Sequence, residues 1–149
     1  MAGLIIPCQP SDEDLQVLEM KIHYRFTNRL LIREALQASS GFNQDGNKTL
    51  AMIGDSILRL VLVTHGYYGK QIRGQISDTI SKKASNANLS KQGFDLGIDK
   101  FIVKNSQPFV GPNVMATTME AIVGAVYVDC NQQIQPCAVV MSALGVCWS

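Results

Sequence analysis

The stretch from residue 47 to residue 63, NKTLAMIGDSILRLVLV, limits the possible folds of this chain more than any other. Apolar residues recur in it at helical spacing and predict a mostly buried helix that runs through the domain. They are Leu50, Ile53, Ile57, Leu58 and Val61. Asp55 is an acid in the middle of this apolar helix, directly after a glycine. An unpaired carboxylate in such a place costs on the order of several kcal/mol, so Asp55 needs a hydrogen-bond partner, a counter-charge or a metal ion.

The length and charge of the chain exclude several classes of protein. Its 149 residues, 46% of them hydrophobic, are enough for one core, and we expect an N-terminal segment, residues 1–10, and a single domain, residues 11–149. The net charge of +1 excludes nucleic-acid binding through bulk charge. The N-terminus has the pattern of neither a signal peptide nor a transit sequence, and no apolar run is long enough to span a bilayer. We therefore expect a soluble intracellular protein without a membrane partner.

Helical periods continue on both sides of the central stretch, and no strand alternation is found, so the sequence predicts an all-α fold. The predicted helices cover residues 12–22, 29–37, 47 to about 66 or 69, 73–93, 114–129 and 134–144. Ser11 and Asp14 form a capping box at the start of the first helix. Thr27 or Asn28 is expected to cap the second helix, and Asn113 the fifth.

The four cysteines show no paired metal-binding spacing, and neither histidine lies near them in the sequence. We interpret Cys8, Cys130, Cys137 and Cys147 as reduced thiols. A disulfide from Cys137 to Cys147 or to Cys8 stays open as an alternative, because pairing cannot be deduced from sequence.

Glu120 is a second acid in the interior of a predicted apolar helix, the fifth one. Hydrolysis of phosphodiesters with hard cations needs several oxygen ligands, because the ion binds phosphate and generates a nucleophilic water. Acids at positions i and i+4 of one helix, facing acids at i and i+3 of another, would supply such a ring. These positions are Ala51 with Asp55, and Thr117 with Glu120, so half of the ring is acidic.

Four segments, in the same order along the chain, carry a resemblance to one protein family. LEMKIHYRFTNRLLIREALQASS is similar to opening helices written LGYRFRDPxLLxEALTHxS, and NKTLAMIGDSILRLVL to a signature written ERLEFLGDAVL. ISKKASNANLSKQGFDLGIDKFI is similar to LSxxRxxLVSNxxLAxxAxxLGLxxFI, and NVMATTMEAIVGAVYVD to KILADAFEALIGAIYLD. Together the segments span about residue 18 to residue 129 and resemble the ribonuclease III domain.

The resemblance implies a bundle of about seven helices that dimerises through the signature helix, binds double-stranded RNA across the dimer and cuts it with four carboxylates and Mg²⁺. Asp55 and Glu120 match two of these carboxylates and are the implied catalytic and metal-binding residues. The other two fall at Ala51 and Thr117, and a further acid near the site falls at Lys48. Mg²⁺ or Mn²⁺ is therefore expected to bind weakly, as one ion that RNA phosphates help to hold.

The resemblance and the charge pattern also suggest positions outside the acids. A position that is acidic in the family falls near Arg73. The best phosphate-facing patch of the chain consists of Arg73, Lys82, Lys83 and Lys91, although a solvated helix face explains these charges equally well. Met52 falls at the aromatic position of the signature that packs across the dimer axis, and it fits the core as well. Tyr67 and Tyr68 are expected to pack rather than to stack on bases.

Two hypotheses about function follow. The first is a ribonuclease III-type homodimer that processes double-stranded RNA through a reduced site at Asp55 and Glu120. The second is a catalytically inactive ribonuclease III fold that serves as an RNA-binding or dimerisation scaffold. In this second hypothesis, hydrogen bonds to Thr117, Lys48 or a backbone amide hold the two acids. A helical module unrelated to RNA would require the order of the four motifs to be accidental.

The end of the chain bears on how RNA would be bound. Family enzymes commonly carry a separate double-stranded-RNA-binding domain after the nuclease domain. Here 20 residues follow the second motif and none is basic. We therefore expect a stand-alone domain whose RNA affinity comes from its own surface and is sensitive to salt.

Overall fold

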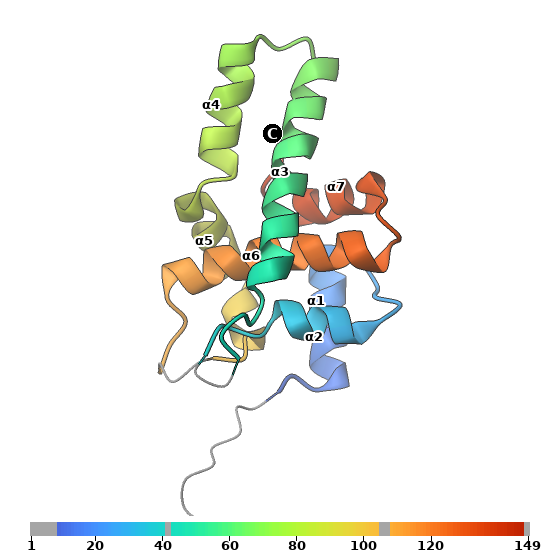
Figure 1. Cartoon of the computed structure of the whole chain (residues 1–149), viewed down its shortest axis with the longest axis vertical. Coiled ribbons are helices and arrows are strands. Elements are labelled where there is room, and N and C mark those ends of the chain that lie inside the picture. The colour runs from blue at the N-terminus through green and yellow to red at the C-terminus, as the bar shows by residue number, and fades with distance from the viewer. Residues whose placement is uncertain (1–8, 41–42, 105–107, 148–149) are drawn as a thin grey trace, which may run out of the picture.

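The computed structural model describes residues 9–40, 43–104 and 108–147, and this part of the chain is all-α. A long helix, α3, runs from the middle of the molecule to its upper end, α6 crosses it near its start, and the shorter helices lie around this pair (Figure 1). In chain order the elements are α1 (Asp12–Ile22), α2 (Arg29–Ala35), α3 (Lys48–Tyr68), α4 (Arg73–Lys83), α5 (Asn86–Asp95), a short 3₁₀ helix η1 (Ile98–Phe101), α6 (Pro112–Asp129) and α7 (Ile134–Ala143). The predicted all-α class is confirmed, and the described residues add one isolated parallel bridge, between Gln37 and Val103.

Two of the predicted helix caps are present. Ser11 Oγ accepts a hydrogen bond from the Asp14 amide at 3.1 Å, while the Asp14 carboxylate accepts one from the Ser11 amide at 3.0 Å. Asn28 caps α2 by accepting from the Leu30 amide at 3.0 Å. Each cap satisfies an amide that the helix itself leaves unpaired, which is worth about 1 kcal/mol.

Two predicted boundaries are wrong. The helical period of residues 73–93 is interrupted at Ser85, whose hydroxyl caps α5 by accepting from the Asn88 amide at 3.1 Å. The fifth predicted helix, α6, begins at Pro112, and Gly111 rather than Asn113 occupies the capping position. Proline suits the first position of a helix because it has no amide hydrogen to leave unpaired.

The crossing of α3 and α6 is a contact of backbone against backbone. A Cβ atom on Gly54 would overlap the carbonyl oxygen of Glu120, and one on Gly124 would overlap that of Leu50. Side chains usually keep packed helix axes about 8–10 Å apart, but these two glycines leave no side chain between the helices. The close crossing brings Asp55, the neighbour of Gly54, beside Glu120.

A buried asparagine fixes the start of α3. Asn47 donates from Nδ2 to the Ala35 carbonyl of α2 at 2.8 Å and to the Thr118 hydroxyl of α6 at 3.1 Å. Both Asn47 and Thr118 are buried, so these bonds satisfy polar groups that water does not reach. The first turn of α3 is thereby joined to two other helices.

A carboxylate fixes the C-terminal end of α6. Asp129 accepts hydrogen bonds from the Tyr24 hydroxyl at 2.6 Å and from the amides of Thr27 and Asn28 at 2.8 Å each. The bonds tie the connection between α1 and α2 to the C-terminal end of α6. Polar contacts therefore hold α6 at Thr118 and at its C-terminal residue, Asp129.

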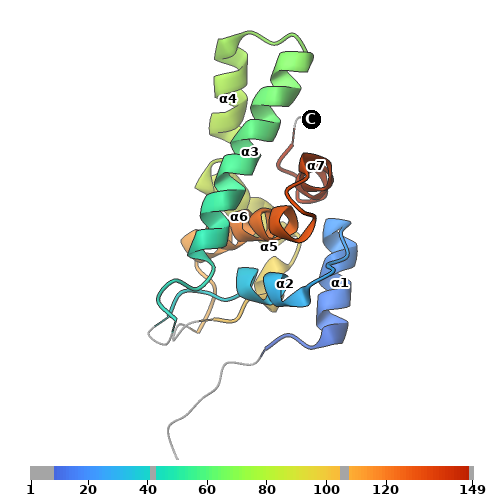
Figure 2. The same ribbon diagram turned by 45° about the vertical axis from the view of Figure 1, so that its right-hand side comes forward.

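α3 extends beyond the body of the fold and pairs with α4 in an arm, which projects in both views (Figures 1 and 2). No residue of α4 is buried. Among the described residues, α3 alone is long and apolar enough by composition to cross a membrane. Its packing against α6 identifies it as the core helix of this fold, since core helices pass the same test.

The cysteines agree with the interpretation as thiols where the structure describes them. Cys130, Cys137 and Cys147 are free, so the alternative disulfide from Cys137 to Cys147 is not formed. Burial is the main cause that raises the pKa of the Cys137 thiol to about 12. Cys8 lies outside the described residues.

Candidate functional site

The candidate site lies where α3 crosses α6 and is built around two carboxylates. Asp55 comes from α3 and Glu120 from α6, and both side chains are partly exposed to solvent. The two groups lie close enough for the Glu120 carboxyl to hydrogen-bond that of Asp55. The fold thus brings together the two acids that the sequence singles out.

This neighbourhood changes the protonation of Glu120. Burial, the hydrogen bond to Asp55 and repulsion by the Asp55 charge, in that order, raise the pKa of Glu120 to about 7, and the positive charge of Arg59 opposes them. Near neutral pH Glu120 therefore carries a proton for part of the time. A cation that bound both carboxylates would have to displace this proton.

Arg59 is a third charged residue of the site, one helical turn beyond Asp55 on α3. Its Nε lies 3.3 Å from Oδ1 and 3.4 Å from Oδ2 of Asp55. The side chains of Arg59 and Asp55 are 57% and 40% exposed, and an ion pair so open to water contributes about 0–1 kcal/mol. Arg59 is not among the site residues predicted from the sequence. The signal that points to it is the i, i+4 spacing from an acid on one helix.

The positions of the missing acids contribute no negative charge. Ala51 is buried, Lys48 is exposed at the start of α3, and Thr117 donates its hydroxyl to the Asn113 carbonyl of its own helix at 2.9 Å. In the hydrogen bonds of the described residues, Asp55 is held by Arg59 and not by Thr117 or Lys48. Arg59 is a partner that the inactive-fold hypothesis does not name, and that hypothesis stays a prediction.

The donor set fits one hard cation and not two. Mg²⁺ typically takes one or two carboxylates from a protein, while waters and substrate phosphates complete its octahedral shell. A two-ion clamp needs a larger cluster, and the parts of the chain that the structure describes contain no cluster of three or more His, Cys, Asp or Glu side chains able to hold a metal. Asp55 and Glu120 are the residues that would hold a single ion.

The predicted basic residues do not form one compact patch. Arg73 begins α4 at the outer end of the arm, whereas Lys82 and Lys83 lie at the other end of that helix (Figure 1). Lys91 on α5 pairs with Asp95 at 2.9 Å, which offsets its charge. The part of α3 beyond the crossing with α6 spans about 20 Å at 1.5 Å per residue, so Arg73 lies far from the two acids of the same chain.

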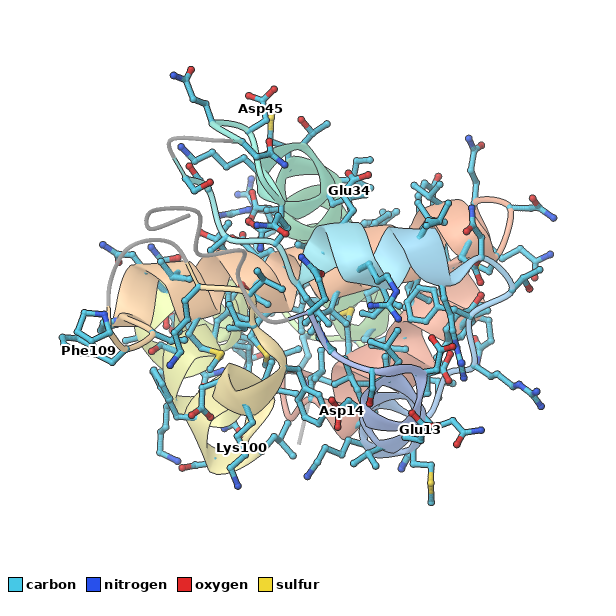
Figure 3. The ribbon with its side chains drawn as sticks, turned by 90° about the horizontal axis from the view of Figure 1, so that it is seen from below. Glu13, Asp14, Glu34, Asp45, Lys100 and Phe109 are labelled. Atoms are coloured by element: carbon cyan, nitrogen blue, oxygen red, sulfur yellow. The ribbon has the colours of Figure 1, made fainter. Side chains whose placement is uncertain are left out.

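The end of the molecule away from the arm carries charges of both signs. Glu13, Asp14, Glu34 and Asp45 lie exposed there, together with Lys100 (Figure 3). Arg33 of α2 pairs with Asp12 of α1 at 2.9 Å on the same side of the fold. The charges of this end therefore do not form a surface of one sign.

Apolar side chains form an exposed stripe along α3, made of Met52, Leu60, Val63 and Tyr67. Met52 is 73% exposed, which excludes the alternative that it is a core residue. Tyr67 and Tyr68 are 73% and 78% exposed and contact each other edge to face, with ring centres 5.4 Å apart. The prediction that these tyrosines are packing groups is confirmed only for their contact with each other, because both side chains are otherwise exposed.

Comparison with known proteins agrees with these features. The Ribonuclease III domain family matches residues 48–131, a range that contains both acids and Arg59. Ribonuclease 3 from Fusobacterium nucleatum is 29% identical over 132 residues, which cover 80% of this chain and 56% of that protein. Ribonuclease 3 from Shewanella denitrificans is 33% identical over 128 residues, which cover 81% of this chain and 56% of that protein. The chain spans about half the length of these relatives.

The fold itself is similar to a solved structure, the nuclease domain of ribonuclease III from Campylobacter jejuni. The TM-score is 0.75 at 21% sequence identity, and the likeness covers 87% of this chain and 95% of that one. The Campylobacter domain has a region involved in dimer formation. At this identity the likeness shows a shared fold.

Proposed function

Because the chain belongs to the ribonuclease III domain family, we propose that it acts on double-stranded RNA as a metal-dependent endoribonuclease. One observation carries this proposal: Asp55 and Glu120 lie side by side at the α3–α6 crossing, where burial and then Asp55 raise the pKa of Glu120 to about 7. Two adjacent carboxylates open to solvent are a suitable donor set for one hard cation and a phosphate.

In this proposal the two carboxylates bind a metal ion that assists hydrolysis of the phosphodiester. A bound Mg²⁺ or Mn²⁺ would supply charge stabilisation at the phosphate and would lower the pKa of a water molecule. Asp55 and Glu120 would hold the ion, and Glu120 would first have to lose its proton. Two missing carboxylates remove transition-state stabilisation of several kcal/mol, so hydrolysis is expected to be slower than with a full ring by a few powers of ten, at about tenfold per 1.4 kcal/mol.

We also propose that two copies of the chain pair through the α3 stripe. Met52, the most exposed member near the site, supports this, because a large apolar side chain open to water gains free energy when a partner covers it. A homodimer would place two carboxylate pairs on one assembly, as the family resemblance implies.

The ion pair between Arg59 and Asp55 favours a second candidate function. With Asp55 already neutralised by a cation of its own chain, the domain would be a catalytically inactive ribonuclease III fold that binds RNA or serves in dimerisation. The two candidates differ in whether the acids are needed for a chemical step.

Cleavage of a long RNA duplex in Mg²⁺ or Mn²⁺ separates the two candidates. The protein is compared with the variants Asp55→Asn and Glu120→Gln, which keep the shape of each side chain and remove its negative charge. We expect slow cleavage by the unaltered protein and a loss of at least about tenfold in each variant. Equal traces from all three proteins would exclude the enzyme and leave the scaffold.

A further inference from the structure

Arg59 lies where it can contact both the carboxylate pair and an incoming ligand. Its Nε is engaged with Asp55, at 3.3 and 3.4 Å from the two carboxylate oxygens. Its terminal nitrogens, Nη1 and Nη2, donate no hydrogen bond to any residue that the structure describes, and the side chain is 57% exposed. The guanidinium therefore has donors available for an anion from solvent while it holds Asp55.

Arg59 and a divalent cation would compete for the same carboxylate. Both carboxylate oxygens of Asp55 accept from Arg59 Nε, and a metal ion beside Glu120 would need at least one of these oxygens as a ligand. The guanidinium and the cation also repel each other at such short range. A phosphate of a bound duplex, in contrast, attracts Arg59, because the planar guanidinium forms strong paired hydrogen bonds with phosphate oxygens.

We propose that Arg59 is a positioning residue that couples RNA binding to metal binding at this site. In the free protein the guanidinium holds Asp55 and weakens the site for a cation. A duplex phosphate draws the guanidinium away, so that Asp55 joins Glu120 around the ion. This inference rests on the proposed function, because it takes double-stranded RNA and a divalent cation as the ligands.

An ordinary surface ion pair would have no such effect, and the chain contains a suitable comparison. Arg33 pairs with Asp12 at 2.9 Å through a terminal nitrogen. That pair joins α1 and α2 and has no part in the α3–α6 site. Arg33→Gln therefore removes one positive charge and one ion pair, as Arg59→Gln does, but away from the carboxylates.

The test measures Mn²⁺ binding by the full chain through the loss of the free-ion signal in electron paramagnetic resonance. The unaltered protein, Arg59→Gln and Arg33→Gln are titrated without RNA and again with a saturating short RNA duplex, whose integrity is checked on a gel. Without RNA, Arg59→Gln should bind Mn²⁺ about three- to tenfold more tightly than the unaltered protein. With duplex, this ratio should fall towards one, because RNA has already released Asp55 in the unaltered protein.

Several outcomes would overturn the inference. Equal affinity of the unaltered protein and Arg59→Gln without RNA would show that the guanidinium does not compete with the cation. If the ratio of the two Mn²⁺ affinities stayed the same with duplex, RNA would not release Asp55 from Arg59. If Arg33→Gln bound Mn²⁺ more tightly by the same factor as Arg59→Gln, the effect would come from net charge alone. If no protein bound Mn²⁺ under either condition, the single-ion site would fall with the inference. Duplex cleavage and duplex binding would still report separately on the proposed action on RNA.

Discussion

Glu120 is a half-buried carboxyl whose charge depends on pH in the physiological range. Its neighbours raise its pKa from 4.5 to about 7, with burial as the largest cause, followed by Asp55. Between these two values the folded protein holds a proton that the unfolded chain has released. The free energy of unfolding of the metal-free protein should therefore fall as pH rises from 4.5 to about 7.

Glu120→Gln should remove this pH dependence, because a neutral amide neither ionises nor repels Asp55. At pH about 8 the variant should be more stable than the unaltered protein by about 1 kcal/mol, after allowance for solvent screening of a group that is only half-buried. At pH about 5 the difference should be small, since the folded unaltered protein is then protonated at Glu120. Urea denaturation in the presence of a chelator measures both values. Parallel stability profiles for the two proteins would contradict the assignment.

The two acids of the site could be predicted from the sequence, but their partner could not. Asp55 and Glu120 stand out because acids inside apolar helices are costly and need an explanation. Arg59 has the spacing of an ordinary solvated ion pair, and only the crossing of α3 and α6 places it beside a second carboxylate. Long-range packing, which periodicity does not describe, decides its role.

At the scale of elements, the crossing of α3 and α6 determines the geometry of the site. Gly124→Ala would place a methyl group against the carbonyl of Leu50 and force the helices apart. We expect it to lower the free energy of unfolding by about 3 kcal/mol and to separate Asp55 from Glu120. Urea denaturation gives the loss of stability.

Gly74→Ala is the matched control for this substitution. It also adds one methyl group to a helical glycine, but nothing lies within 4 Å of the added atom. Alanine favours the helix by up to about 1 kcal/mol over glycine, so this variant should be neutral or slightly more stable. Similar losses in the two variants would contradict a specific role for the crossing.

Helix type and order were predictable from the apolar period, whereas two boundaries were not. Ser85 lies in a polar stretch that continues the helical period, so the break between α4 and α5 has no apolar signal. At α6 the first turn begins at Pro112, one residue before the asparagine that has the stronger capping preference. A side-chain hydrogen bond to Ser85 sets the first boundary and the proline backbone sets the second, and neither is a matter of apolar period.

At the scale of the whole molecule, the exposed α3 stripe should determine the oligomeric state. Met52→Lys would place a charge in the proposed contact and should weaken a dimer by about tenfold or more. Met20→Lys on α1 is a matched control, because Met20 is also exposed, at 77%, and lies outside the stripe. Sedimentation velocity over a range of concentrations measures the dimer. A monomeric unaltered protein, or equal weakening by both variants, would contradict the α3 contact.

The ribonuclease III domain was predictable because four motifs occur in the family's order, and the match over residues 48–131 confirms it. The arm was not predictable. It depends on where α3 leaves its packing against α6, which the apolar period of α3 does not show (Figure 1). The basic residues illustrate the same limit: they are close in sequence, yet the turn after Lys83 and the length of α4 separate them in space.

The most direct test of a ribonuclease III site reduced to two acids is the rate of duplex cleavage after the missing acids are restored. Ala51→Glu and Thr117→Asp are combined in one protein, and cleavage of a long RNA duplex in Mg²⁺ is followed under single-turnover conditions beside the unaltered chain. We predict a rise of about a hundredfold or more, because each 1.4 kcal/mol of restored stabilisation gives a factor of ten. The rise should disappear when Asp55→Asn is added to the restored protein. An unchanged rate in the restored protein would contradict the central claim that Asp55 and Glu120 are half of a working metal site.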